Sequence, residues 1–326
     1  MDGLCLLKGL SCHELMLRSN YMSNYTHSHS VIESFRSAMN DKGITAPREI
    51  YVDNAIHRFN THGNKPRNKS AWYVMFSNRI TSGAFGCWKL GVTYSWCEKN
   101  FQQMTYSEWV EHKKQIEEAQ RKLKIEKVRE QIKAAERAQY IYNSLPSANP
   151  QHSYLIRKLI KPFSARQKLN KLVLPIIDFE RKIWSLQFIS PDGSKQFLSN
   201  GAIKGHFISI QGYPAIGFNH LICESFSTGA TLAEFYPDAC VLSACSAGNL
   251  ESVAVNVRKQ LPTAEIIICA DDDRLNINNP GITKGRSAAI ASGALFCQPK
   301  WPSDAPKDLT DFNDLSCWLA QKGLIA

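Results

Sequence analysis

The residues of this sequence best suited to chemistry are carboxylates that follow predicted strands. Glu224 comes directly after one short apolar run, and Asp271 and Asp273 follow another. Because alternate residues of an extended segment point to the same side, Asp271 and Asp273 are predicted to face one space while Asp272 points away. Carboxylates gathered at one sheet edge repel one another, and a hard cation such as Mg²⁺ removes that repulsion. The spacing therefore predicts a metal site.

Basic residues follow these acids closely along the chain. Acidic and basic side chains in one cleft are typical of metal-assisted phosphate chemistry. A lone Asp at such a place is most often a helix N-cap or a solvated loop residue. Three acids at the ends of neighbouring strands favour the functional interpretation. The nearby cations are Arg274, Lys284 and Arg286, and a further acidic group near the end of the sequence contains Asp311 and Asp314.

The elements that must position these residues alternate between strands and helices. Short apolar strands separated by helices of about ten residues predict a parallel sheet with helices on both faces. In open α/β sheets the chemistry lies at the carboxyl ends of the strands, which is where the acids stand. Strands are expected at 220–223, 239–244 and 265–270, and helices at 226–235, 249–260 and 283–293.

The chain before this sheet divides into segments of different character. A helix at 31–40 and the β-branched, aromatic and glycine-punctuated runs after it predict a small β-rich module. A long charged stretch without Gly or Pro predicts a helix, either a solvated connector or a basic helix that faces nucleic acid. The predicted organisation is a disordered N-terminus (1–30), the β-rich module (31–106), the charged helix (107–143), a mixed α+β subdomain (151–215) and a catalytic α/β domain (216–326).

Composition limits the class of protein. The 326 residues carry 39 Lys and Arg against 29 Asp and Glu, a formal net charge of +10 that favours a polyanionic partner such as nucleic acid. Hydrophobic residues make up 44%, which excludes global disorder. No apolar run approaches the ~18–20 residues of a membrane span, so no membrane partner is expected. None of the ten cysteines form a Cys-x-x-Cys pair, so we expect buried reduced thiols, no zinc and a cytoplasmic protein.

The stretch 220–316 resembles a Toprim domain, the metal-binding fold shared by bacterial primases, topoisomerases of types IA and II, and some nucleases. In that family a Glu ends the first strand and an Asp-x-Asp ends a later strand. Glu224, Asp271 and Asp273 fit those positions. The resemblance implies that these three acids are catalytic and bind Mg²⁺ or Mn²⁺, with Glu224 either ligating the metal or relaying a proton.

Within this family the sequence more closely resembles the primases of conjugative plasmids and satellite phages. Their signature Glu-Gly-Tyr-Ala-Thr-Ala is similar to Glu-Ser-Phe-Ser-Thr-Gly at 224–229, where Ser225 replaces the family glycine. Their later Asn-Pro-Gly and Asp-Phe-Asn-Asp blocks are similar to 279–281 and 311–314.

Residues 171–212 are similar to the basic half of a bacterial primase core. Lys171, Lys195 and Lys204 stand at the positions of its lysines. The resemblance implies that they hold the template and the nascent strand, and surface lysines on a hairpin are the alternative.

The β-rich module is similar to one that precedes such primases, in the place of a zinc-binding domain. It lacks the spacing of zinc ligands. Arg58 and Lys89, mixed with aromatic residues, suit single-stranded nucleic acid, unless the aromatics form the core of the module.

The resemblance implies a nucleotidyltransferase of the DNA primase type. It would make short RNA primers on single-stranded DNA from ribonucleoside triphosphates, for the replication of a mobile element such as a plasmid or phage. Asp311 and Asp314 would hold a further metal, and Arg274, Lys284 and Arg286 would meet the triphosphate. No Gly-x-x-x-x-Gly-Lys-Ser/Thr motif is present, so a helicase is expected to be supplied separately. A Toprim nuclease and a non-catalytic single-strand-binding replication accessory are the alternatives.

Overall fold

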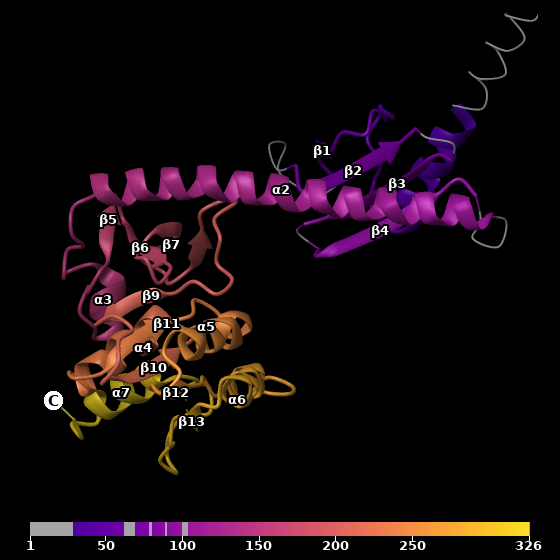
Figure 1. The fold of residues 1–326 in the computed structure, drawn as a ribbon. Coiled ribbons are helices and arrows are strands. Elements are labelled where there is room, and N and C mark those ends of the chain that lie inside the picture. Colours follow the sequence, from indigo (N-terminus) through magenta and orange to yellow (C-terminus); the bar gives the residue numbers. More distant parts are fainter. Residues whose placement is uncertain (1–28, 62–68, 78–79, 89, 100–103, 326) are drawn as a thin grey trace, which may run out of the picture. The chain divides into compact units, whose positions relative to one another are not determined.

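The computed structural model describes residues 29–61, 69–77, 80–88, 90–99 and 104–325. The predicted disorder of residues 1–30 falls almost wholly outside these ranges. The chain forms two compact units, one up to Glu126 and one from Lys127, and each is described by itself (Figure 1). None of the helices in these ranges combines the length and the apolar character that crossing a membrane requires.

The first unit contains a four-stranded antiparallel sheet and a helix at residues 29–41. The strands neighbour one another in chain order: β1 (His57–Phe59), β2 (Ala71–Phe76), β3 (Ser82–Cys87) and β4 (Val92–Cys97). Phe35 of the helix packs edge-on against Tyr73 and Phe85 of the sheet. Trp72 and Tyr73 are each 1% exposed, so both aromatics belong to the core of this unit. The helix and the β-rich pattern predicted for this segment are both present.

A 39-residue helix, α2 (Tyr106–Ser144), contains residues of both units. It lacks Gly and Pro, so every backbone N–H beyond its first turn can join the helical ladder. Ala119 is fully buried against Trp72 of the first unit, and Ala138 is fully buried against Val173 of the second. The long charged helix predicted for this stretch is confirmed.

The second unit holds two sheets, the first of which is antiparallel. It follows the short helix α3 (Ser153–Lys158) and consists of β5 (Arg166–Lys168), β6 (Lys171–Ile177), β7 (Ile183–Ile189) and β8 (Lys195–Phe197). The predicted turn at 190–193 joins β7 to β8, and the Gly193 N–H donates to the Ser190 carbonyl at 2.9 Å. Gly193 has a φ of +91°, a conformation that glycine adopts without steric cost. This turn sets Lys195 at the start of β8.

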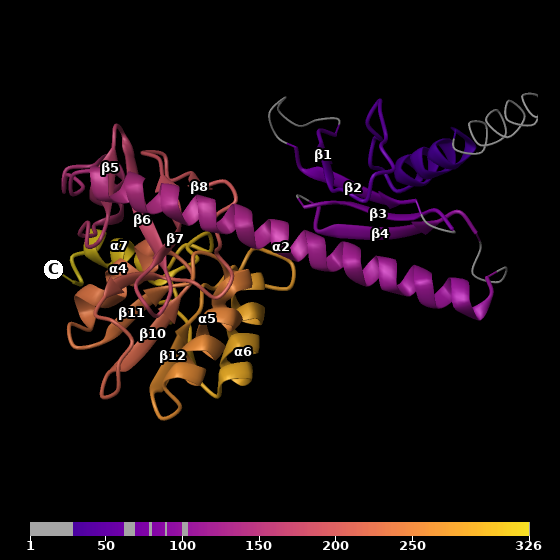
Figure 2. The same cartoon turned by 45° about the horizontal axis from the view of Figure 1, so that its top comes forward.

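The second sheet of this unit has the strand order β13-β12-β10-β11-β9. Only the edge strand β9 runs antiparallel to its neighbour. The helices lie on both sides of this sheet, with α5 and α6 side by side (Figure 2). The strands are β9 (Ile208–Gln211), β10 (Asn219–Cys223), β11 (Cys240–Ser243), β12 (Glu265–Cys269) and β13 (Leu295–Cys297), and the helices are α4 (Phe226–Phe235), α5 (Ala247–Gln260), α6 (Pro280–Ser292) and α7 (Phe312–Gln321).

Alternate residues of β10 serve the two faces of the sheet. Leu221 and Cys223 join the core cluster that contains Phe226 of α4. Ile222 joins the cluster that contains Leu250 of α5. Because a strand has a side-chain period of two, one apolar run supplies both cores. The predicted fold class, a parallel sheet with helices on both faces, is confirmed, whereas β9, β13 and α7 were not among the predicted elements.

Candidate active site at the sheet edge

The register of the parallel sheet brings Glu224 and Asp271 to one edge. β10 pairs with β12 so that Cys223 faces Cys269, and the two acids follow these partners by one and two residues. β11 ends beside them, where the Ser243 hydroxyl donates to the Glu224 carbonyl at 3.0 Å. The adjacency that the sequence predicts for these strand ends is therefore present.

Asp271 is the most perturbed acid of this edge. Burial raises its pKa to about 9, and the carboxylates of Asp311, Glu224 and Asp273 add to that increase. Its Oδ1 atom is buried and finds no hydrogen-bond partner among the described residues. A buried carboxyl group without a donor is costly to ionise, so Asp271 holds its proton at neutral pH in the free chain.

Glu224 directly precedes the N-cap of α4 and also meets the first turn of α5. Burial raises its pKa, and the nearby carboxylates of Asp273 and Asp311 act in the same direction. The Ala247 N–H in the first turn of α5 hydrogen-bonds to the Glu224 carboxylate and lowers the pKa in part. Four carboxyl groups thus influence one another at this edge: Glu224, Asp271, Asp273 and Asp311.

The Asn-Pro-Gly block positions the two residues that follow Asp271. Asn279 accepts from the Asp273 N–H at 2.9 Å and donates to Asp272 at 2.7 Å. Asp272 also accepts from the Trp301 indole at 2.8 Å. Its carboxylate thus bonds to Asn279 and Trp301 and does not join the carboxylate cluster, as the alternation of side chains predicts. The sequence identified this block by its resemblance only, and its contacts explain why an Asn is needed there.

Gly281 in the same block stands against the backbone of Asp271. A Cβ atom on Gly281 would lie 2.3 Å from the Asp271 carbonyl oxygen, a distance that real Cβ atoms do not adopt. Its N–H donates to the Asp273 carboxylate at 3.0 Å. The start of α6 is therefore fitted closely to the Asp-x-Asp segment.

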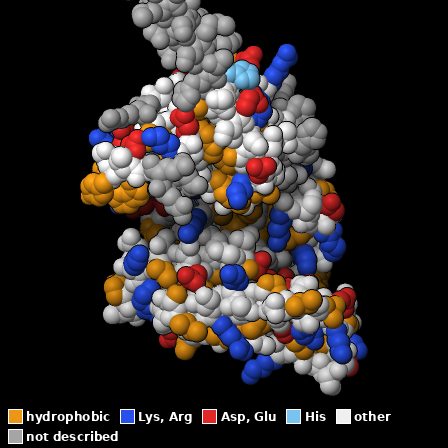
Figure 3. All heavy atoms as spheres, turned by 90° about the vertical axis from the view of Figure 1, so that its right-hand side faces the viewer, with side chains coloured by type: hydrophobic (Ala, Val, Ile, Leu, Met, Phe, Trp, Pro, Cys, Tyr) orange, Lys and Arg blue, Asp and Glu red, His pale blue; other side chains and the backbone are white. Residues whose placement is uncertain are grey.

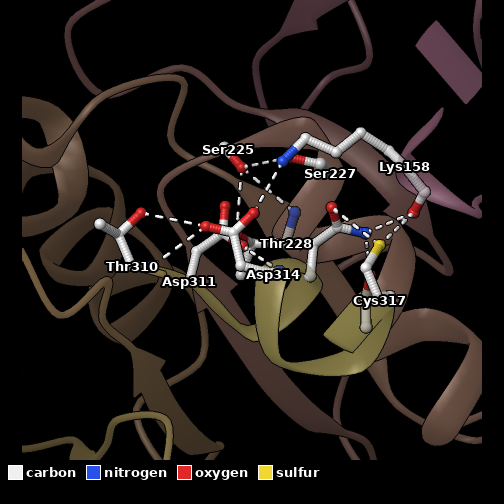
Figure 4. Close-up of polar contacts among 10 residues, drawn as sticks. Lys158, Ser225, Ser227, Thr228, Thr310, Asp311, Asp314 and Cys317 are labelled. Atoms are coloured by element: carbon white, nitrogen blue, oxygen red, sulfur yellow. Dashed lines mark hydrogen bonds and ion pairs between the residues drawn. The ribbon is translucent and has the colours of Figure 1, made fainter. Parts of the chain in front are cut away.

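Asp311 and Asp314 differ in their surroundings (Figure 4). Asp311 is the N-cap of α7, where it accepts from the Asp314 N–H at 2.7 Å, and burial raises its pKa. Asp314 pairs with Lys158 of α3 at 2.9 Å. Burial acts to raise the pKa of Asp314, but hydrogen bonds from Lys158 and Thr310 outweigh it and lower that pKa.

Lys158 is a residue of this site that the sequence does not reveal. It lies 156 residues from Asp314 in the chain, on a short helix without any recognisable motif. The Asn313 amide and the Cys317 thiol also donate to the Lys158 carbonyl, so three contacts join α3 to α7. The ion pair occupies one oxygen of Asp314, whereas Asp311 has no cation bonded to it in the described part of the chain.

Ser225 begins α4 as its N-cap. Its hydroxyl accepts from the Thr228 N–H at 3.1 Å and lies within hydrogen-bond distance of the Ser227 hydroxyl (Figure 4). Its φ of −111° is open to any residue, so the position does not require the glycine of the family signature.

Among the predicted nucleic-acid contacts, Lys195 is one whose charge acts on the acids of the sheet edge. Burial raises the pKa of Glu224, Asp271 and Asp311, and the Lys195 ammonium acts in the opposite direction on all three. Lys171 lies in the same antiparallel sheet, where it donates to Gln196 at 3.4 Å. Lys204 is exposed in the loop before β9.

The three predicted triphosphate contacts have different surroundings. Arg274 donates to the carbonyls of Pro306 and Leu309 and lies 4.2 Å from the Trp301 ring, so its guanidinium is occupied by the protein's own loop. Lys284 and Arg286 are exposed on α6. Lys and Arg side chains spread over the face that Figure 3 draws, with acidic side chains between them.

The predicted nucleic-acid residues of the first unit are described in part. Arg58 on β1 stacks over Trp88 at 4.5 Å, and Trp88 is 37% exposed. Lys89 lies outside the described residues. The half-buried Arg58 over the exposed Trp88 is compatible with the predicted stacking surface, whereas the buried Trp72 and Tyr73 fit the alternative that aromatics form the core.

The donors at the sheet edge suit a hard cation, although they are not gathered around one point. Within the described ranges, no group of three or more His, Cys, Asp or Glu side chains is arranged to hold a metal ion. The partnerless Oδ1 of Asp271 and the mutual repulsion of four carboxyl groups are what a bound Mg²⁺ would relieve. The residues therefore fit the ion by chemistry, and binding must draw them together.

Part of the second unit is similar to a known domain family. Residues 219–318 match the family model described as the Toprim domain, so the resemblance predicted for 220–316 is confirmed. The parallel-sheet part of the chain is therefore similar to Toprim domains.

More particular similarities are to DNA primases. Two Escherichia coli proteins named DNA primase TraC are 30% identical over 259 residues and 29% identical over 301 residues. The matches cover 75% and 87% of this chain but only 24% and 20% of those relatives. The primase fragment of the bacteriophage T7 primase-helicase protein matches 55% of this chain and 76% of its own, at 15% identity and a TM-score of 0.38. The predicted similarity to Toprim-domain DNA primases is confirmed.

Proposed function

We propose that this chain is a DNA primase that makes short RNA primers on single-stranded DNA for the replication of a mobile element. The observation that carries the proposal is the set of four carboxyl groups at one sheet edge, among them a buried Asp271 oxygen that no described residue hydrogen-bonds. The similarity to proteins named DNA primase supports the same activity. We place the activity in the cytoplasm, with a helicase supplied by another chain.

Glu224, Asp271 and Asp273 would hold Mg²⁺ or Mn²⁺, with Asp311 beside them. A bound divalent cation supplies charge that offsets the negative charge of nucleotide phosphates during transfer. Asp311 is the stronger candidate of the C-terminal pair, because Asp314 already has Lys158 as its cation. We assign no zinc to the chain.

Asp271 couples metal binding to a proton. Because its pKa is about 9, it carries a proton at neutral pH and must release it before its oxygen can act as a ligand. The affinity of this site for the divalent cation therefore rises as the pH rises through the neutral range. Glu224, whose pKa burial also raises, is the second group able to move a proton there.

Basic residues around the acids would orient the substrates. The charge of Lys195 acts on Glu224, Asp271 and Asp311 alike, so it is the first candidate to hold a phosphate of the primer or template. Lys171 and Lys204, which belong to the same unit as Lys195, would share this role. Lys284 and Arg286 would meet the triphosphate. Arg58 and Lys89 would contact single-stranded DNA in the first unit.

Primer synthesis on single-stranded circular DNA tests the proposal. Labelled ribonucleotides are supplied with Mg²⁺ or Mn²⁺, and Asp271→Asn is compared with Asp238→Asn, an exposed acid in the turn after α4. Labelled oligonucleotides from the wild type and from D238N, but not from D271N, support a primase with this metal site.

Two results would contradict the proposal. Metal-dependent degradation of the DNA without labelled oligonucleotides would indicate a nuclease built on the same acids. Synthesis that survives in D271N would show that the acidic cluster is not the catalytic site.

A further inference from the structure

Two cysteines face each other on neighbouring strands of the parallel sheet. Cys269 ends β12 and Cys297 ends β13, and the register of the two strands pairs them directly. Their Sγ atoms lie 3.4 Å apart, which is hydrogen-bond distance for sulfur. Neither thiol has a part in the primer synthesis proposed above.

The backbone geometry permits a bond between them. Neighbouring strands lie about 4.8 Å apart, within the Cα separation of about 4.4–6.8 Å found in disulfides. The register of β12 and β13 thus sets the two thiols at a separation that a disulfide can span.

A cavity gives access to the pair. It has a volume of about 540 Å³ and lies between α4, α7 and the strands β10, β12 and β13. Both cysteines line it, together with apolar side chains such as Leu232 and Phe312. Cys297 is half-buried whereas Cys269 is 1% exposed, so a reagent in the cavity meets Cys297 first.

The two thiols are also unequal in acidity. The hydrogen bond with Cys269 lowers the pKa of Cys297, although burial opposes this shift. The thiolate is the form of cysteine that attacks a disulfide. The more accessible thiol is thus also the better nucleophile.

We propose that Cys269 and Cys297 form a redox-active dithiol site that exchanges with small organic disulfides. The Cys297 thiolate attacks one sulfur of the reagent, whose S–S bond breaks and whose other sulfur leaves as a thiolate that takes up a proton. Cys269 then loses its proton and attacks the Cys297 sulfur of the mixed disulfide, which releases the second reagent thiol. Two protein thiols are oxidised to one disulfide, and one reagent disulfide is reduced to two thiols.

The site adjoins the segment that carries Asp271. The Ala270 N–H donates to the Cys297 carbonyl at 3.0 Å, and Asp271 is the next residue. A disulfide would therefore tie β13 to β12 immediately before the acidic edge of the sheet.

The test is a thiol map of the full chain before and after oxidation. The protein is incubated with oxidised glutathione and EDTA, quenched in acid, alkylated with iodoacetamide and analysed by peptide mass spectrometry. We expect a linked Cys269–Cys297 peptide and the loss of two alkylatable thiols, both reversed by dithiothreitol. Cys297→Ser should lose the linked peptide, while Cys97→Ser, which removes a half-buried thiol of the first unit, should retain it.

Three outcomes would overturn the proposal. Glutathione could remain on Cys297 while Cys269 is still alkylated, both thiols could stay reduced, or the disulfides could join other cysteines. If Cys297→Ser does not fold, the peptide map of the wild type decides alone. Because the measured quantity is a covalent bond, the result does not depend on whether the chain makes primers.

Discussion

Replacement of Asp271 by Asn should stabilise the metal-free chain while abolishing primer synthesis. Asp271 has a buried Oδ1 that receives no hydrogen bond from the described part of the chain, and it lies beside three other carboxyl groups. Asn is nearly isosteric and carries no charge, and its NH₂ group can donate to the neighbouring carboxylates. The repulsion that the acidic edge imposes on the fold is therefore reduced.

The size of the effect follows from proton linkage. Burial raises the pKa of Asp271 from its ordinary 3.8 to about 9. Between these pH values the folded chain binds about one more proton than the unfolded chain. The free energy of unfolding therefore falls by about 1.4 kcal/mol for each unit by which the pH rises. From about pH 5.5 to about pH 7.5 the advantage of the variant should grow by about 2 to 3 kcal/mol.

Urea unfolding followed by circular dichroism measures this difference. Wild type, D271N and the control D238N are compared at both pH values in EDTA. The first unit is identical in all three proteins, so its contribution cancels. Added Mg²⁺ should stabilise the wild type and flatten its pH dependence, because the cation replaces the proton.

A pH-independent difference between D271N and wild type would refute the reasoning. It would show that Asp271 is ionised in the folded chain and that the buried oxygen has found a compensating partner. A stabilisation of equal size in D238N would attribute the effect to net charge instead of burial.

Three further substitutions test the supports of the site. Gly281→Ala should lower the unfolding free energy by about 1–3 kcal/mol in urea titrations, and primer synthesis with it, because the new methyl group meets the Asp271 carbonyl at 2.3 Å; unchanged stability would contradict the close fit. Lys158→Met should cost about 1–3 kcal/mol at neutral pH by leaving Asp314 without its cation. That loss should fade as the pH falls through the lowered pKa of Asp314, and an equal loss in acid would refute the ion pair. Ser225→Gly should cost only a few tenths of a kcal/mol of unfolding free energy, since glycine is a tolerated N-cap; a large loss of primer synthesis would assign the hydroxyl to catalysis.

Local pattern was sufficient to predict most elements of the parallel sheet. The helix predicted at 226–235 has those bounds in the structure, and β12 ends one residue before the prediction. Apolar runs and turn residues report on each segment separately, so they are readable without knowledge of the fold. The strand β13 was missed because it has only three residues, too few for a period to show.

The proximity of the first three acids was also predictable, for a topological reason. Parallel strands end at the same edge, so acids that follow neighbouring strands must converge there. The sequence could not supply the strand order, but three consecutive β–α units leave few arrangements. Glu224 and Asp271 follow from that restriction.

The remaining parts of the site depended on packing between segments far apart in the chain. Lys158 meets Asp314 because α3 packs against α7, and Cys269 meets Cys297 because β13 joins β12 in register. The sequence by itself determined which acids stand at strand ends and which runs form the core. Only the tertiary structure decided that Oδ1 of Asp271 has no donor among the described residues and that Asp314 already has a cation. Burial and long-range pairing are properties of the packed chain and not of its local sequence.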